Sequence, residues 1–161
     1  MISDALLADA ASLLQACRVR GVKLATAESC TGGLIAGVLT AIAGSSDVLE
    51  RGFITYSNAS KTELLGVPAE LIQAEGAVSE PVAQRMAEGA LARSHADIVV
   101  SVTGVAGPGG GSMAKPVGLL WFGLAQRGQP IASERRIFPG DRTAIRVAAV
   151  QQAFGLIRAR L

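Results

Sequence analysis

The stretch VKLATAESCTGGLIAGVLTAI, residues 22–42, decides the fold class of this 161-residue chain. Residues 22–27 are mostly apolar and predict a short strand, whereas the apolar run from Gly32 to Ile42 predicts a helix. A strand that leads directly into a helix is typical of α/β proteins. The polar residues 28–31 form the junction, which is open to three interpretations: a catalytic elbow, a phosphate cradle or a capped turn.

The remaining sequence continues this alternation and ends with a hairpin and a helix. Apolar residues between Leu6 and Cys17 repeat at helical spacing, and Gly21 stands where a C-cap glycine is expected. Further helices are predicted from Lys61, over residues 68–73, from Ser79 and after residues 138–142. Further strands are predicted over residues 52–56, 98–102, 117–126 and 131–138, the last two as an antiparallel hairpin. These elements predict a mostly parallel sheet covered by helices.

Length and composition predict a single globular domain over residues 1–161. Half of the residues are apolar and 17% are charged, which excludes a disordered chain. The net charge is only +2 and no clustered basic face is visible, so we expect no nucleic-acid partner.

The sequence also predicts a cytoplasmic location. It contains no apolar run of about 18 residues, so we expect no contact with a membrane. Acidic residues come early and no basic segment precedes them, so we expect no signal peptide. Cys17 and Cys30 stand in unrelated contexts, which suggests neither a disulfide nor a metal site.

The predicted topology brings three polar loops to one edge of the sheet. If the crossovers are right-handed and the first three strands are parallel, the segments that follow these strands lie side by side. They contain Glu28 and Ser29, residues 56–61, and residues 103–111. We expect the functional site at this edge.

Several classes of chemistry are improbable there. The only histidine, His95, precedes a predicted strand and therefore belongs to the opposite end of the sheet, which argues against a Ser-His-Asp triad. No metal-binding motif is present. The glycine-rich loop TGVAGPGGG, residues 103–111, leads into a strand rather than a helix, so it is a weak signal for nucleotide binding and fits a flexible connection equally well.

A serine activated by a lysine remains, and the candidates are Ser29 and Lys61. To act as a base, Lys61 must be neutral, so its pKa must fall from about 10.4 toward about 7 through burial or a nearby cation. The alternatives are a solvated lysine at the start of a helix, and Ser29 or Thr31 as a cap of the helix at Gly32.

Four neighbouring side chains are further candidates, and three of them have an ordinary alternative. Glu28 orients a substrate donor or Lys61, or points to solvent. Tyr56 ends a strand and either donates a hydrogen bond to a ligand or is an ordinary aromatic at the edge of the core. Thr103 ends the buried third strand, where its hydroxyl can reach a ligand. Arg142 is a candidate phosphate clamp or a surface arginine.

Ser46 is a competing nucleophile. The helix from Gly32 to Ile42 should carry the chain back to the opposite end of the sheet, so Ser46 should lie away from Lys61 unless a neighbouring subunit supplies it. We therefore prefer Ser29, and interpret Ser45 and Ser46 as caps of a turn at Asp47.

Seven segments resemble the CinA C-terminal domain family, which includes the bacterial nicotinamide-nucleotide amidohydrolases. The resemblance runs from about Gly21 to Arg146, and the family's N-terminal domain is absent, so the chain resembles the stand-alone form. In order, the segments are TAESCTGG (26–33), IAGSSDVLERGFITYSNASK (42–61), LLGV (64–67), GAVSEPVA (76–83), TGVAGPGGG (103–111), KPVG (115–118) and FPGDR (138–142).

The resemblance implies a three-layer α/β/α sandwich with a mixed, mostly parallel sheet of about five strands. It also implies that the protein hydrolyses nicotinamide mononucleotide to nicotinate mononucleotide and ammonia, a step of NAD recycling, through a Ser/Lys mechanism without a cofactor or metal. It does not decide between Ser29 and Ser46. The substrate-binding residues would be Thr31, Gly32, Gly104, Ala106, Gly107 and Arg142.

Two further points stay open on the sequence, the activity and the oligomeric state. The chain is either this amidase, an amidase for another nucleotide or small amide, or a non-catalytic nucleotide-binding module with a regulatory role in competence. A homo-oligomer, whose second subunit completes the site, is compatible with the sequence.

Overall fold

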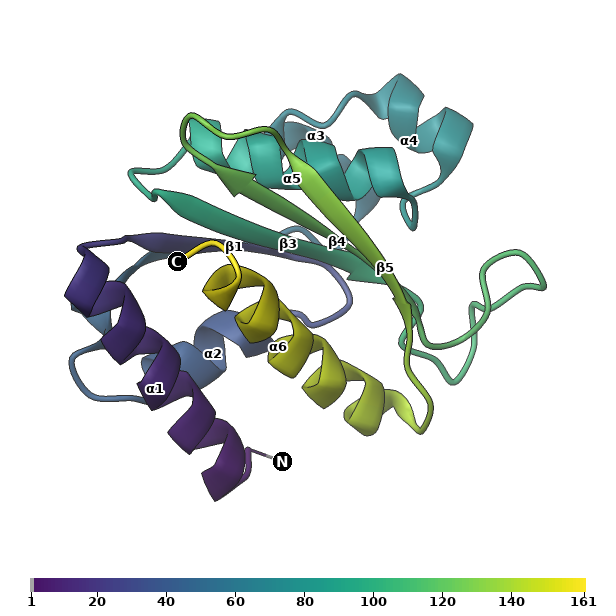
Figure 1. Ribbon diagram of the computed structural model, residues 1–161. Coiled ribbons are helices and arrows are strands. Elements are labelled where there is room, and N and C mark those ends of the chain that lie inside the picture. The colour runs from purple at the N-terminus through teal and green to yellow at the C-terminus, as the bar shows by residue number, and fades with distance from the viewer. Residues whose placement is uncertain (1) are drawn as a thin grey trace.

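The structure is a computed structural model that describes residues 2–161. A five-stranded sheet lies between two layers of helices (Figure 1). The elements in chain order are α1 (Asp4–Arg20), β1 (Leu24–Glu28), α2 (Leu34–Thr40), the short 3₁₀ helix η1 (Ser45–Asp47), β2 (Leu49–Ile54), α3 (Asn58–Leu65), α4 (Ala69–Glu75), α5 (Glu80–Ala92), β3 (Ile98–Gly104), β4 (Leu119–Gln126), β5 (Ala132–Ile137) and α6 (Arg142–Arg158).

The sheet is mixed, with the strand order β2-β1-β3-β4-β5. β1 pairs in parallel with both β2 and β3, whereas β3 with β4 and β4 with β5 pair antiparallel. Four strands therefore run in one direction and only β4 runs against them. This arrangement confirms the expected three-layer α/β/α sandwich.

Each face of the sheet has its own layer of helices and its own apolar core. Figure 1 shows α1, α2 and α6 on one face and α3, α4 and α5 on the other. In β3, Val100 and Val102 belong to the core under α1, α2 and α6, while Val99 belongs to the core under α5. Because both faces are covered, β1 is buried along its whole length.

The second strand and the helix after it differ from the sequence expectation. β2 begins at Leu49 and ends at Ile54, so Tyr56 lies beyond the strand rather than at its end. β2 is an edge strand that carries the charged residues Glu50 and Arg51, and these hide its first half from a search for apolar runs. α3 begins at Asn58 because the Ser57 hydroxyl caps it by accepting a hydrogen bond from the Ser60 N–H, and Lys61 therefore ends its first turn.

None of the helices within residues 2–161 is both long and apolar enough to cross a bilayer.

Gly89 of α5 allows this helix to lie directly against the end of α3. A Cβ atom at this position would stand 1.9 Å from the carbonyl oxygen of Leu65. We expect Gly89→Ala to lower the free energy of unfolding by about 2–3 kcal/mol, because overpacking outweighs the gain of about 1 kcal/mol in helix propensity. Urea unfolding measures the change.

Gly155 of α6 provides the matched control, since a Cβ atom there would meet no heavy atom within 4 Å. Gly155→Ala should raise the free energy of unfolding by up to about 1 kcal/mol. Equal stability of the two variants would show that α3 and α5 can separate without cost.

Candidate active site

The carboxyl ends of β1, β2 and β3 lie together, as the parallel order requires. The Ser29 N–H donates a hydrogen bond to the Val102 carbonyl of β3 at 3.0 Å. The Thr55 N–H, just beyond β2, donates to the Glu28 carbonyl of β1 at 2.8 Å. The peptide group that joins Glu28 to Ser29 is therefore held from both sides, by β3 and by the segment after β2.

Ser29 and Lys61 meet at this edge. The Lys61 Nζ donates hydrogen bonds to the Ser29 Oγ at 3.0 Å and to the Thr55 carbonyl oxygen at 2.8 Å. Lys61 is only 1% exposed and Ser29 is 9% exposed. α3 follows β2 after a short connection, and its first turn directs Lys61 toward the end of β1. The alternative of a solvated lysine is wrong.

Burial lowers the pKa of Lys61 below that of an exposed lysine, and only a charged thiolate at the nearby Cys30 would oppose this change. Burial also raises the pKa of the Cys30 thiol to about 12, so this neighbour is uncharged at neutral pH. No carboxylate within residues 2–161 forms an ion pair with Lys61. A desolvated amine without a counter-charge is biased toward its neutral form, the form that can accept a proton from a serine.

Glu28 is fully buried and holds the start of α2. Its Oε2 accepts a hydrogen bond from the Ile35 N–H at 3.0 Å, and its Oε1 accepts one from the Ala36 N–H at 2.9 Å. The alternative in which Ser29 or Thr31 caps a helix at Gly32 is wrong: α2 begins at Leu34, and the carboxylate of Glu28 binds the first N–H groups of this helix. The alternative in which Glu28 points to solvent is wrong as well, and its carboxylate is directed at α2.

The turn between Glu28 and α2 consists of residues 29–33. Thr31 is buried, and its hydroxyl has no hydrogen-bond partner among residues 2–161. The Gly32 N–H donates to the Ser29 carbonyl, whereas the N–H groups of Cys30 and Thr31 donate to no backbone carbonyl in the described part of the chain. Gly32 has a positive φ of 59°, which favours glycine at this position.

The two other candidate hydroxyls differ in their surroundings. The Thr103 Oγ1 donates to the Ala77 carbonyl oxygen at 2.8 Å and thereby anchors the segment before α5. Tyr56 is 61% exposed, and its hydroxyl accepts a hydrogen bond from the Arg142 Nη2 at 3.0 Å. The proton of Thr103 is therefore already engaged, whereas that of Tyr56 has no acceptor within residues 2–161.

Arg142 also binds the glycine-rich loop, since its Nη1 donates to the Gly107 carbonyl oxygen at 2.8 Å. This loop projects from the sheet between β3 and β4 (Figure 1). Gly104 is required by packing: a Cβ atom there would stand 2.5 Å from Leu120 of the neighbouring strand. Ala106 is buried at the base of the loop. The loop is thus fastened to the site through Arg142.

Ser46 lies at the other end of the sheet. It is an exposed residue of η1, immediately before β2, whereas Lys61 lies beyond the end of that strand. The six residues of β2, at about 3.3 Å each, separate the two by roughly 20 Å within one chain. Neither Ser45 nor Ser46 caps a turn, because Gly44 is the N-cap residue and no side chain contributes.

Arg146 was not among the residues expected from the sequence. Its Nη2 donates to the Thr31 carbonyl oxygen at 2.7 Å, which places a guanidinium group against the turn that carries Ser29. One feature of the sequence could have pointed to Arg146. It follows Arg142 by four residues, and this spacing puts both side chains on one side of α6.

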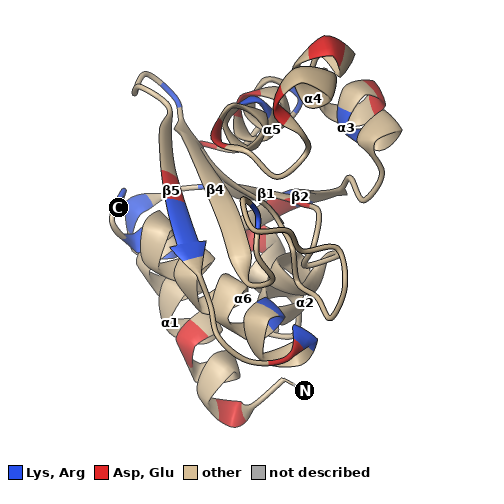
Figure 2. Ribbon diagram, turned by 90° about the vertical axis from the view of Figure 1, so that its right-hand side faces the viewer, with Lys and Arg blue, Asp and Glu red and all other residues tan. Residues whose placement is uncertain are grey.

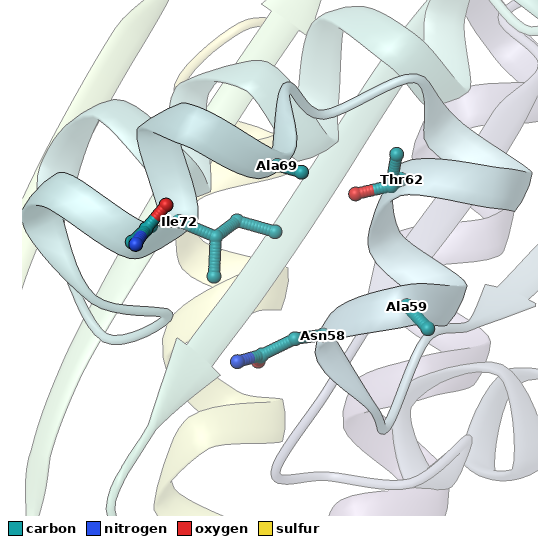
Figure 3. Close-up of a pocket in the computed structure, with 6 residues that line it drawn as sticks. Asn58, Ala59, Thr62, Ala69 and Ile72 are labelled. Carbon is teal, nitrogen blue, oxygen red and sulfur yellow. The ribbon is translucent and has the colours of Figure 1, made fainter.

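Hollows border α3, which carries Lys61, and α6, which carries Arg146. One lies between α3 and α4, where the side chains of the two helices face each other (Figure 3), but its lining residues include neither Ser29 nor Lys61. It is lined by Asn58, Ala59, Thr62, Ala69, Ile72 and Gln73. The other, of about 240 Å³, lies between α2 and α6 and is lined by Leu34, Thr143, Arg146 and Val147. No group of three metal-ligating side chains occurs within residues 2–161.

Known proteins resemble the whole of this arrangement. The family model of the CinA C-terminal domain matches residues 7–161. The nicotinamide-nucleotide amidohydrolase PncC of Escherichia coli K12 is 53% identical over 140 residues, which cover 86% of this chain and 84% of that protein. The CinA-like protein of Akkermansia muciniphila is 52% identical over 86% of this chain, but the chain spans only 34% of that longer protein.

A solved structure supports the same relationship. The crystal structure of the competence/damage inducible protein CihA from Agrobacterium tumefaciens matches with a TM-score of 0.94 and 45% identity over 99% of this chain and 97% of that one. Sequence and fold therefore agree over nearly the full length, and the chain belongs to the CinA C-terminal domain family.

Proposed function

We propose that this protein hydrolyses the carboxamide of nicotinamide mononucleotide to give nicotinate mononucleotide and ammonia. The observation that carries the proposal is the buried hydrogen bond of 3.0 Å between the Lys61 Nζ and the Ser29 Oγ, in surroundings that lower the pKa of the lysine. The printed name of the E. coli relative, nicotinamide-nucleotide amidohydrolase, supports the choice of substrate.

In the proposed first step, the neutral amine of Lys61 accepts the hydroxyl proton of Ser29 while the Oγ attacks the carboxamide carbon. The tetrahedral intermediate collapses as the C–N bond breaks, and the Lys61 ammonium returns its proton to the leaving nitrogen, which departs as ammonia. The remaining acyl group is an ester of Ser29. Water, deprotonated by Lys61, attacks this ester, and the serine recovers its proton as nicotinate mononucleotide leaves.

The negative charge of the tetrahedral intermediate requires hydrogen-bond donors close to Ser29. The N–H groups of Cys30 and Thr31 follow the nucleophile directly and donate to no backbone carbonyl in the described residues. The N–H groups of Ile35 and Ala36 are already bound by Glu28. We therefore assign the oxyanion to Cys30 and Thr31, with the Tyr56 hydroxyl as an additional donor.

The substrate itself favours the proposed form of Lys61. The pyridinium ring of nicotinamide mononucleotide carries a positive charge, and a cation beside an amine lowers the pKa of that amine further. Lys61 lacks an ion-pair partner within residues 2–161 that would oppose this effect. Binding of the substrate thus supports proton transfer from Ser29.

The test is the release of ammonia from nicotinamide mononucleotide by the purified protein. We expect turnover without added metal, and a Ser29→Ala preparation made in the same way serves as the control for contaminating amidases. If nicotinamide mononucleotide binds in calorimetry but no ammonia forms, the alternative of a non-catalytic nucleotide-binding module is correct. If the protein hydrolyses another amide but not nicotinamide mononucleotide, the proposed mechanism stands and the proposed substrate is wrong.

A further inference from the structure

The guanidinium of Arg146 differs from the other arginines near the site in how few of its donors are used. Arg142 donates through both Nη1 and Nη2 to protein oxygens. Arg146 makes one hydrogen bond, from its Nη2 to Thr31, and its Nε is buried without a partner among residues 2–161. A guanidinium offers five N–H donors, so most of those of Arg146 remain available.

Arg146 also lacks a negative partner. It forms no ion pair within residues 2–161, whereas Arg158, just over three turns later on the same helix, pairs with the carboxylate of Asp9. A partly buried cation without a counter-charge is costly unless something anionic neutralises it. The surroundings of Arg146 therefore suit a bound anion.

Room for such an anion exists beside this side chain. Arg146 lines the hollow of about 240 Å³ between α2 and α6, together with Leu34, Thr143 and Val147. Figure 2 shows blue segments of α6 next to α2, on the side of the molecule where the ends of the strands meet. Thr143 adds a hydroxyl to the same hollow.

The turn of residues 29–33 connects this hollow to the reacting groups. Ser29 stands at one end of the turn, hydrogen-bonded to Lys61, and the guanidinium of Arg146 rests on the Thr31 carbonyl two residues later. A Cβ atom at Gly32 would lie 3.7 Å from the Arg146 Nη2, so the guanidinium faces the Gly32 side of the turn. A nucleotide with its carboxamide at Ser29 can therefore extend its phosphate across the turn toward Arg146.

We propose that Arg146 binds the 5′-phosphate of the nucleotide substrate in the hollow between α2 and α6, and thereby selects the nucleotide over the nucleoside. The proposal rests on the proposed function. Guanidinium groups bind phosphate oxygens through two parallel hydrogen bonds, a geometry that lysine cannot reproduce. The competing role is purely structural: Arg146 would only hold α6 against the turn of residues 29–33.

The two roles are separated by comparing nicotinamide mononucleotide with nicotinamide riboside, which lacks the phosphate. For Arg146→Met we expect the ratio of kcat/KM between mononucleotide and riboside to fall about 10- to 100-fold, the effect of losing a charge-assisted hydrogen-bonded pair. Arg146→Lys should recover part of the ratio. Arg158→Met, the same change at a paired arginine of α6, should leave the ratio as in the wild type.

A loss of the same factor on both substrates in Arg146→Met would overturn the proposal and leave the structural role. Calorimetry separates this failure from a failure of the proposed function. If the wild-type protein releases no ammonia, the proposed function fails. The affinities of the wild type and of Arg146→Met for the mononucleotide and for the riboside then still show whether Arg146 binds the phosphate. Equal affinities of the wild type for the two ligands would overturn the proposed role of Arg146.

Discussion

Replacing Ser29 by alanine is expected to lower kcat for nicotinamide mononucleotide by at least about 10⁴-fold, while the free energy of unfolding changes by less than about 1 kcal/mol. Removal of the nucleophile in serine hydrolases costs losses of this order, because the remaining groups still bind substrate but cannot form the acyl intermediate. The fold should tolerate the change, since the Ser29 N–H is held by the sheet and, among residues 2–161, its Oγ is bound to Lys61 alone. Ammonia release and urea unfolding give the two values.

Ser46→Ala is the control for the rival nucleophile. Ser46 is exposed at the opposite end of β2, so this variant should retain nearly full activity. Full activity of Ser29→Ala combined with loss of activity in Ser46→Ala would show that Ser46 attacks. Since Ser46 lies about the length of β2 from Lys61, that result would require a second subunit to bring the two together.

Replacing Lys61 by methionine should lower kcat by about 10³- to 10⁴-fold or more, and Lys61→Arg should do the same. An arginine keeps the positive charge but does not release its proton, so it cannot act as the base. The double variant Ser29→Ala, Lys61→Met should be no less active than the worse single variant, because the two groups act as one unit. Additive losses would show that Lys61 acts independently of Ser29.

The lowered pKa of Lys61 also predicts how stability depends on pH. Between this lowered value and the unfolded value of about 10.4, the unfolded chain holds one more proton at residue 61 than the folded chain does. The free energy of unfolding contributed by Lys61 therefore rises with pH in this window, by up to about 1.4 kcal/mol per pH unit, and is constant below it. The cost of burying the protonated amine is greatest at low pH.

Urea unfolding of the wild type and of Lys61→Met between pH 7 and pH 9.5 measures this contribution. The stability of the wild type relative to the variant should increase as the pH rises. The same deprotonation should appear as a rising limb in the profile of kcat/KM against pH. Parallel stability curves would mean that residue 61 has the same proton affinity in both states, and would contradict the proposed neutral base.

The adjacency of Ser29 and Lys61 was predictable because it depends on topology. A parallel order of the first three strands brings the segments that follow them to one edge of the sheet. The apolar runs that predict these strands were clear enough to show how many strands there are. The exact boundaries of β2 and α3 were not predictable to the residue. β2 is an exposed edge strand with charged residues, and the start of α3 depends on a hydrogen bond from the Ser60 N–H to the Ser57 hydroxyl.

The roles of Glu28 and Arg146 were out of reach for a different reason. Glu28 stands beside Ser29 in the sequence, yet its carboxylate accepts its hydrogen bonds from Ile35 and Ala36 of α2. Arg146 is separated from Thr31 by most of the chain and meets it only because α6 packs beside α2. Such contacts depend on the packing of elements, which residue spacing along the chain does not record.

The residue pattern was sufficient for the α/β class and for the sheet edge at which Ser29 and Lys61 meet, because both follow from local periodicity and from the order of the elements. Whether Lys61 is exposed or buried was decided by three-dimensional packing. The desolvation that lowers its pKa comes from the sheet and helices around it, and the hydrogen bond to Ser29 exists because two loops from neighbouring strands converge. Proximity and burial are collective properties of the packed chain, and they turn an ordinary serine and lysine into a buried, hydrogen-bonded pair.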